Sequence, residues 1–409
     1  METLDCRKLP GFEAARAITD HFNKLAPGAR FAALIGDYAM GLRGWLLEAG
    51  LRHRAAATPE GGWRLDFTRG LSAAQGSMPG LHHLVADAEG TVWACQRGPL
   101  VARIEPGGKS RPRSAAVTRK GSHIALDATA RRLVIADPEL DRLVAVDADT
   151  LAVQAHWPAP GGPQLPLISP EGIICVTGHV TGTLTIVRPQ AGGFAEQTIE
   201  VGPGPHDPAV SADGAAVFVP CMGGDEVVKV ALADGRILGR TRAGHGPSHA
   251  KADHRRRRLY VANSWDGTVT AMSEDGVALA RAPSGGWAHA VEVTSDGQWV
   301  LVANFLDDTV TVFAADGLTP AARLETEAYP HGLDVARDGK RFVVTGFAAD
   351  HARIFEVGSW RLLARVEVGR GGSHTAFAPE GDLAFVACSV DDHLAALDLA
   401  AGTVTARVT

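Results

Sequence analysis

From about residue 81 to its end, the chain repeats one pattern of hydrophobic and polar positions. The clearest copies begin at His289 (HAVEVTSDGQWVLVANFLDDTVTVFAADG), at His331 and at His374, and each alternates short apolar runs with turns that contain Asp and Gly. Such a copy predicts four short strands joined by tight turns. The units that we assign start at His83, His123, Gln164, His206, His249, His289, His331 and His374.

The length of this repeat indicates the architecture. The spacing runs from 40 residues (His83 to His123) to 43 residues (His206 to His249), and a four-stranded unit of about 40–45 residues is the size of one β-propeller blade. Eight units predict a mainly β fold with an eight-bladed propeller over residues 81–409. Residue 409 falls at the end of the last unit's fourth strand, so the ring would close without strand exchange between its ends. A count of seven blades therefore stays open.

Residues 1–70 follow a different period and predict a small α/β domain. Apolar residues recur at helical spacing from Phe12 to Leu25, and a Pro-Gly pair then ends the predicted helix. A strand is expected over Arg30–Ile35, a second helix over Leu42–Ala49 and a strand over Trp63–Phe67, which gives a β-α-β-α-β unit. Residues 71–80, LSAAQGSMPG, are small and turn-rich, so we place the linker there.

The composition and charge of the chain argue against several classes of protein. A net charge of −6 from 40 Lys+Arg and 46 Asp+Glu argues against a nucleic-acid binder, because such domains are usually basic. No run of about 18 apolar residues is present to cross a membrane, and the charged N-terminal segment lacks the apolar core of a signal peptide. We therefore expect a cytoplasmic protein whose five cysteines are reduced thiols. The run Arg255–Arg258 is expected to be a solvated charge run.

Two parts of the chain resemble known families. The segments LYVAN at 259–263, VLVAN at 300–304 and TVTVF at 309–313 resemble the YVTN β-propeller repeat. The N-terminal unit resembles the small sulfur-carrier (TusA-like) family through Leu4–Leu9, Leu25–Gly28 and Gly61–Phe67. That family's catalytic Cys-Pro pair would fall at Gly11-Phe12, so the resemblance implies a docking or dimerisation module that binds a protein partner rather than a sulfur carrier.

A histidine recurs at one register of the repeat. Seven of the eight units carry it at the entry to the first strand, and the third unit has Gln164 instead. First strands line the central channel of a propeller, so these imidazoles should converge at one mouth of that channel. Neutral imidazole is a common ligand of Zn, Cu, Fe and Ni. The predicted metal ligands are His82, which adds a donor beside the first unit's histidine, and His83, His123, His206, His249, His289, His331 and His374.

A second register adds sulfur ligands to this hypothesis. Second strands end at a common position, and three of the eight residues there are cysteines. Antiparallel pairing places each beside its own unit's histidine. We therefore add Cys95, Cys221 and Cys388 to the predicted metal ligands, because thiolate and imidazole together suit Zn, Cu(I) or Fe. The alternative is that a small buried Cys simply packs in the core.

These patterns support three functions. The first is binding of a transition metal (Cu, Fe or Zn) or a haem-like cofactor by the histidine ring, with an oxidoreductase as one use of such a site. The chain resembles nitrous oxide reductase and copper-dependent thiol oxidases in that arrangement alone. The second is a non-enzymatic interaction scaffold. The third is a lactonase-type hydrolase, which normally gathers carboxylates around a divalent ion, whereas the ring here is rich in imidazole.

Overall fold

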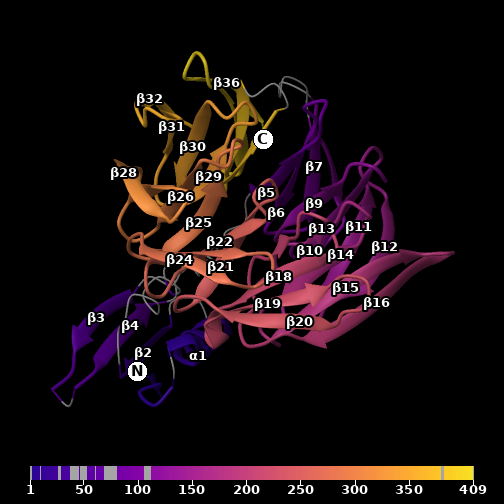
Figure 1. The fold of residues 1–409 in the computed structure, drawn as a ribbon. Helices are drawn as coiled ribbons and strands as arrows, with labels where there is room; N and C mark the ends of the chain where they lie inside the picture. The colour runs from indigo at the N-terminus through magenta and orange to yellow at the C-terminus, as the bar shows by residue number, and fades with distance from the viewer. Residues whose placement is uncertain are drawn as a thin grey trace.

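The computed structural model describes residues 2–9, 11–25, 29–36, 46, 53–59, 61–68, 81–105, 112–378 and 382–408. Between residues 81 and 408 it contains eight four-stranded antiparallel sheets arranged in chain order. Figure 1 shows their first strands gathered near the centre and their fourth strands at the rim. The predicted mainly β fold with eight propeller blades is thus confirmed.

The first four blades differ in the length of their innermost strands, which have two residues in blades three and four. Their bounds are β5 (Leu81–Ala86), β6 (Val92–Gln96), β7 (Leu100–Ile104) and β8 (Arg113–Ala116); β9 (Ile124–Asp127), β10 (Arg132–Asp137), β11 (Arg142–Asp147) and β12 (Val153–Pro158); β13 (Leu167–Ile168), β14 (Ile174–Gly178), β15 (Thr183–Gln190) and β16 (Gly193–Glu200); β17 (Ala209–Val210), β18 (Ala216–Cys221), β19 (Glu226–Ala231) and β20 (Ile237–Arg242).

The last four blades are more regular. Their bounds are β21 (Pro247–Asp253), β22 (Arg258–Asn263), β23 (Thr268–Ser273) and β24 (Ala278–Pro283); β25 (Ala288–Val293), β26 (Trp299–Asn304), β27 (Thr309–Ala314) and β28 (Thr319–Glu325); β29 (Pro330–Val335), β30 (Arg341–Gly346), β31 (His351–Glu356) and β32 (Leu362–Glu367); β33 (Gly372–Phe377), β34 (Leu383–Cys388), β35 (His393–Asp398) and β36 (Thr403–Val408). A short 3-10 helix, Met222–Gly224, follows β18.

Burial along a blade explains the sequence pattern. In β26 all residues after Trp299 are buried, because second strands are covered on both faces by the neighbouring blades and so read as continuous apolar runs. In the outer strand β28, exposed and half-buried residues alternate. The predicted Asp-Gly hairpin turn is present between β25 and β26, where Gly297 has φ of 69° and Asp296 Oδ1 accepts a hydrogen bond of 2.9 Å from the Gln298 amide.

The second strand ends at a buried residue in seven blades; in blade one it ends at Gln96, which is half-buried, and the predicted ligand Cys95 lies one residue earlier. In β26 the last residue is Asn304, whose Nδ2 donates to the hydroxyls of Thr309 (3.0 Å) and Thr311 (2.9 Å), while Ser284 Oγ donates to its Oδ1 at 2.6 Å. The amide thus ties the second and third strands of the blade to the loop that precedes it.

In the part of the chain that the structure describes, the ring closes between the last and the first blade without shared strands. All four strands of blade eight come from residues 372–408, and all four of blade one from residues 81–116. Apolar residues of the two blades, including Leu84 and Phe385, pack in one core. Ser373 Oγ donates to the His82 carbonyl at 2.8 Å, and Asp392 Oδ1 accepts from the Leu81 amide at 3.1 Å. The first and last blades are therefore held by packing and a few polar contacts.

The N-terminal unit lies outside the ring (Figure 1) and differs from its prediction in one strand. It contains β1 (Glu2–Asp5), α1 (Gly11–Lys24), β2 (Arg30–Ile35), β3 (His53–Ala57) and β4 (Trp63–Thr68), in the sheet order β1-β2-β4-β3. β1 and β2 are parallel, as a crossover through α1 requires. The sequence pattern missed β3. The predicted helix Leu42–Ala49 lies outside the described residues except Leu46, which is helical and buried, and the predicted linker 71–80 lies outside them entirely.

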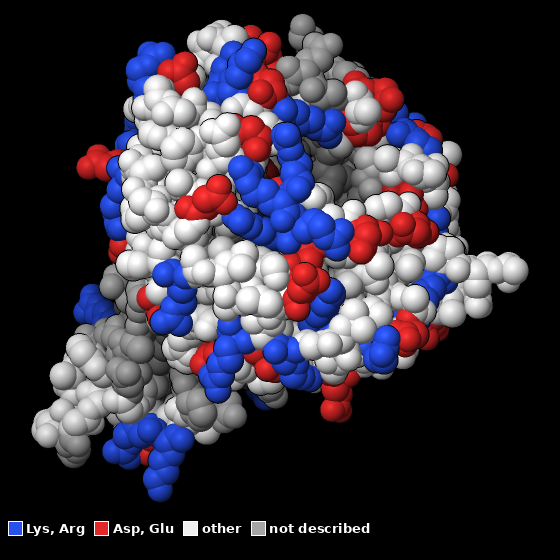
Figure 2. Space-filling model, in the orientation of Figure 1, with Lys and Arg blue, Asp and Glu red and all other residues white. Residues whose placement is uncertain are grey.

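Charge on the propeller is largely paired. Figure 2 shows Lys and Arg side chains gathered near the middle of the face drawn, with Asp and Glu beside them. In the arginine run, Arg257 contacts Glu274 at 2.9 Å and Arg258 contacts Asp316 at 2.6 Å. Among the described residues, no helix is both long and apolar enough to cross a membrane.

Candidate functional site

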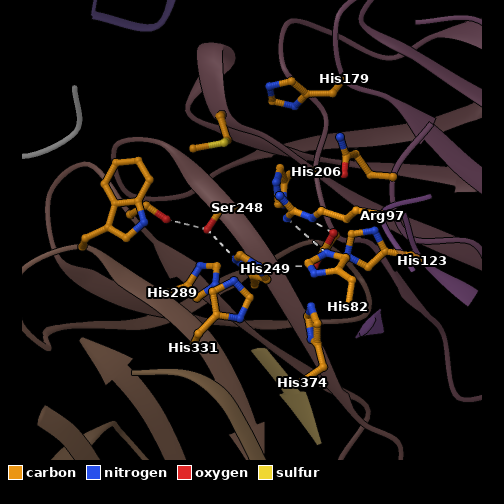
Figure 3. Close-up of a pocket in the computed structure, with 15 residues that line it drawn as sticks. His82, Arg97, His123, His179, His206, Ser248, His249, His289, His331 and His374 are labelled. Atoms are coloured by element: carbon orange, nitrogen blue, oxygen red, sulfur yellow. Dashed lines mark hydrogen bonds and ion pairs between the residues drawn. The ribbon is translucent and has the colours of Figure 1, made fainter. Parts of the chain in front are cut away.

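The axial mouth of the propeller is a cavity of about 200 Å³ lined mainly by histidines. Its volume is an order of magnitude above the ~10–15 Å³ that one water needs, so it has room for a small ligand. Figure 3 shows the imidazoles directed toward one another around this space. The lining histidines are His82, His123, His179, His206, His249, His289, His331 and His374.

Successive imidazoles touch around the ring. The distance between ring centroids is 4.9 Å for His206 and His249, 4.3 Å for His249 and His289, and 4.6 Å for His289 and His331. The contacts continue through His374, which lies 5.0 Å from both His331 and His82. Gln164 of the third blade also lines the mouth. The structure therefore brings together the imidazoles that the repeat predicted to meet.

The first strands aim these side chains through β-bulges. The ladder between first and second strands shifts register at the histidine in five blades: around His82, Ser248, His289, His331 and Ser373-His374. A bulge inserts an extra residue, bends the strand and re-aims a side chain, and bulges are common beside active sites. The bulges turn the imidazoles toward the axis at the end of the strand.

In the first blade the member of the mouth is His82 rather than His83. His82 is 2% exposed and lines the mouth cavity. His83 lies one residue further along β5 and lines a second cavity, of about 210 Å³, where its Nδ1 accepts a 3.4 Å hydrogen bond from the Ile124 amide. The second cavity shares His123, His249, His289, His331 and His374 with the mouth, so the histidine layer borders both.

Two groups of side chains have the compactness of a metal site. In the first, His82, His123 and His374 offer ligand atoms that lie within 4.8 Å of one another; in the second, His206, Asp207 and His249 do so. His123 Nδ1 and His374 Nε2 are buried and have no hydrogen-bond partner. His82 Nε2 accepts a hydrogen bond of 3.2 Å from Arg97 Nη2, since a guanidinium only donates. His123 and His374 thus each have a ring nitrogen that a cation would satisfy, whereas His82 would have to exchange its hydrogen bond from Arg97 for the ion.

Six of the imidazoles that border the two cavities have lowered pKa values. Burial lowers the pKa of His289 to about 3 and that of His83 to about 4. Burial, together with the positive charge of Arg97 and of the neighbouring rings, holds the pKa of His82 and of His123 well below the usual range. The pKa values of His249 and His374 are lowered in the same direction by burial and neighbouring imidazoles. Neutral imidazole is the form that coordinates metals.

The three cysteines of the predicted ligand set lie between the blades. Cys95 Sγ donates to the Ser122 carbonyl at 3.2 Å and Cys388 Sγ to the Val368 carbonyl at 3.4 Å, and Cys221 packs among the apolar residues of blades three and four. Burial raises the pKa of each thiol to about 12. Neither of the two compact groups found among the described residues includes a cysteine. Cys95 pairs with His83 across the ladder, as expected, but the same prediction is wrong for the other two cysteines, because Cys221 pairs with Pro205 and Cys388 with Gly372.

Several residues of the mouth were not singled out by the sequence pattern, among them Arg97, Ser248 and Asp207. Arg97 follows the second strand of blade one, Ser248 precedes His249 and Asp207 follows His206; all three line the cavity. Only Asp207 left a signal in the sequence, because it is the one charged residue directly after a mouth histidine. The others after mouth histidines are His83, Ile124, Val180, Ala250, Ala290, Gly332 and Thr375.

The fold and this site define a β-propeller with an axial mouth of imidazoles. The family model described as "Lactonase, 7-bladed beta-propeller" matches residues 178–362, which run from the third to the seventh of the eight blades here. No protein with a curated description matches the chain in sequence.

Solved structures share the propeller fold at low identity. Hydrazine synthase from Kuenenia stuttgartiensis aligns with a TM-score of 0.56 and 15% identity over 78% of this chain and 96% of its own. A putative 6-phosphogluconolactonase from Bacteroides uniformis aligns with a TM-score of 0.53 and 15% identity over 64% and 89%. A streptogramin B lyase aligns with a TM-score of 0.52 and 13% identity over 66% and 91%. At these identities the likeness shows the fold alone.

Proposed function

We propose that this protein hydrolyses a cyclic ester, a lactone, at the axial mouth, with a transition-metal ion held by His82, His123 and His374. The observation that carries the proposal is the convergence of these three imidazoles, whose ligand atoms lie within 4.8 Å of one another. Three protein ligands with a position left for water or substrate are the usual set of a catalytic zinc site, and His₃ is one of its known forms.

The lactone class is supported by sequence comparison. The matched family model is that of a lactonase, and the match spans the blades that carry His206, His249, His289 and His331. The mouth, at about 200 Å³, suits a small ester. The expected gathering of carboxylates around a divalent ion is replaced here by imidazoles, which bind zinc as neutral donors.

A zinc ion in such a ligand set lowers the pKa of a bound water to about 7 and so supplies a nucleophile at neutral pH. The chain contributes the remaining functions. The low pKa values of the ring histidines keep their lone pairs available. Arg97, which contacts His82 Nε2, is placed to turn toward the ester carbonyl and donate to the oxygen on which negative charge develops.

The number of imidazoles favours a second candidate, an oxidoreductase that uses copper or iron. The mouth is lined by eight histidines, more than one hydrolytic ion requires, and imidazole suits Cu and Fe as well as Zn. The identity of the bound metal separates the two candidates: a redox-inactive metal with ester hydrolysis supports the first, and copper or iron without hydrolysis supports the second.

The test uses the full chain purified without a histidine tag. We expect hydrolysis of glucono-1,5-lactone, followed with a pH indicator, to require added Zn²⁺ and to fall by at least about 100-fold in His123→Ala and His374→Ala, since removal of a metal ligand abolishes the site. His156→Ala, an exposed histidine on β12, is the matched control and should retain full activity. Less than about 0.3 bound metal per chain after incubation with Zn²⁺, with no lactone hydrolysed, would overturn the proposal in favour of a scaffold.

A further inference from the structure

The fourth blade departs from the repeat at the channel. Its histidine is flanked by prolines in the segment Pro205-His206-Asp207-Pro208, and its first strand β17 has only two residues, Ala209–Val210. Proline has no amide hydrogen to donate to a ladder. The main chain of Asp207 instead bonds the next blade: its amide donates to the Ser248 carbonyl at 3.0 Å and its carbonyl accepts from the Ala250 amide at 3.1 Å. The backbone thus fixes Asp207 beside His249.

The side chains converge in the same place. Asp207 Oδ2 lies 3.2 Å from His249 Nε2, and Asp207 Oδ1 lies 3.4 Å from His206 Nδ1. His206 Nδ1 is buried and makes no hydrogen bond. The three side chains are 16–18% exposed, so they reach the cavity while remaining largely enclosed.

Hydrogen bonds behind His249 fix which of its nitrogens carries the proton. Ser264 Oγ donates to the Ala288 carbonyl at 2.8 Å, so Ser248 Oγ, 2.6 Å away, must donate to Ser264. Ser248 then accepts the 2.9 Å hydrogen bond from His249 Nδ1. Nδ1 carries the proton, and Nε2 directs its lone pair at the carboxylate of Asp207. Two electron-rich atoms at 3.2 Å repel each other unless a cation lies between them.

We infer that His206, Asp207 and His249 form a second divalent-metal site, so that the mouth holds two ions. A carboxylate with two imidazoles suits Zn²⁺, Mn²⁺ or Fe²⁺, and a metal-binding histidine donates its other ring N–H to an orienting acceptor, a place that Ser248 Oγ takes for His249. The first group comes from blades eight, one and two and the second from blades four and five, so the ions face each other across the cavity. The second ion would hold the substrate of the proposed hydrolysis, and its use there rests on that proposal.

The experiment counts ions. Metal-free full-length protein is titrated with Zn²⁺, and bound metal is measured after gel filtration. We expect about two ions per chain in the unchanged protein, about one in Asp207→Asn and about one in His123→Ala, each loss being at least about 100-fold in affinity. Ser248→Ala should weaken only the Asp207 site, by about tenfold or more. Asp225→Asn is the matched control, because Asp225 contacts His245 at 2.8 Å outside the channel; it should retain two ions.

The outcomes separate this inference from the proposed function. One ion in the unchanged protein that is lost in His123→Ala and kept in Asp207→Asn would overturn the second site and leave the hydrolase proposal standing. Two ions in Asp207→Asn would also overturn it, since Asp207 would not be a ligand. No ion at all would overturn both. Circular dichroism of every variant confirms that a lost ion does not reflect a lost fold.

Discussion

Acid should destabilise the metal-free propeller steeply, because its axial imidazoles lack a second proton in the folded state. The pKa is about 3 for His289 and about 4 for His83, and it is well below the usual range for His82, His123, His249 and His374. In the unfolded chain the same groups titrate near ~6.5. Below that pH the unfolded state binds more protons, so stability is complete above about pH 6.5 and falls as the pH approaches the folded-state values.

The size of the effect follows from the same shifts. Each of these histidines costs about 1.4 kcal/mol for every pH unit below about 6.5, or about 2 kcal/mol at pH 5. The six together cost at most about 12 kcal/mol there, which is comparable with the whole stability of an ordinary domain, about 5–15 kcal/mol. The metal-free propeller should therefore lose its cooperative melting transition between pH 7.5 and pH 5.

Thermal melts followed by circular dichroism across this range measure the effect. His289→Gln removes one buried titrating group and should reduce the acid-induced loss by about 2 kcal/mol at pH 5. The control is His254→Gln, an exposed histidine, which should leave the loss unchanged. A melting temperature that moved by less than about 3 °C between pH 7.5 and pH 5 would refute the reasoning, because a loss of 1 kcal/mol alone shifts it by about 2–4 °C.

Three further substitutions follow from the site and the blades. Arg97→Met removes a positive charge beside His82 and should tighten Zn²⁺ binding about tenfold or more, measured by competition with a chelator; weaker binding would contradict this. Cys95→Ser should leave the metal count unchanged, because its Sγ faces the Ser122 carbonyl; loss of an ion would make it a ligand. Asn304→Ala removes the hydrogen bonds that its side chain makes with three hydroxyls and should cost about 2–3 kcal/mol in urea unfolding, against near zero for exposed Gln154→Ala.

The propeller could be predicted from sequence because each blade repeats the same pattern of buried and exposed positions. Second strands covered on both faces must be apolar throughout, as in LYVAN and VLVAN, and Asp-Gly turns mark where they begin. The missed strand β3, His53–Ala57, is short and rich in alanine, a residue depleted in strands. Its place in the sheet is set by pairing with β4, which no local pattern records.

The site was predictable in its residue type and less so in its geometry. Because the first strands of all blades surround one central axis, the repeat predicts that their histidines lie in one layer around that axis. The register within the layer depends on bulges, and a bulge of one residue decides that His82 rather than His83 enters the mouth. Cys95 and Cys388 pair with residues of the first strands and Cys221 with Pro205 just before one, but the Sγ atoms of Cys95 and Cys388 face carbonyls of the loops between blades. Asp207 reaches His249 through the backbone of another blade, a contact that the period alone does not encode.

The way in which the first and last blades meet gives the first histidine group a second role, in the stability of the closed ring. Among the described residues no strand crosses that junction, and the two end blades meet by side-chain packing and a few hydrogen bonds. His82 and His374 stand on opposite sides of the junction and His123 on the next blade. An ion bound to all three would link blade eight to blades one and two. Bound metal would then slow the separation of blade one from blade eight, and removal of the metal by a chelator would let the two blades separate more readily.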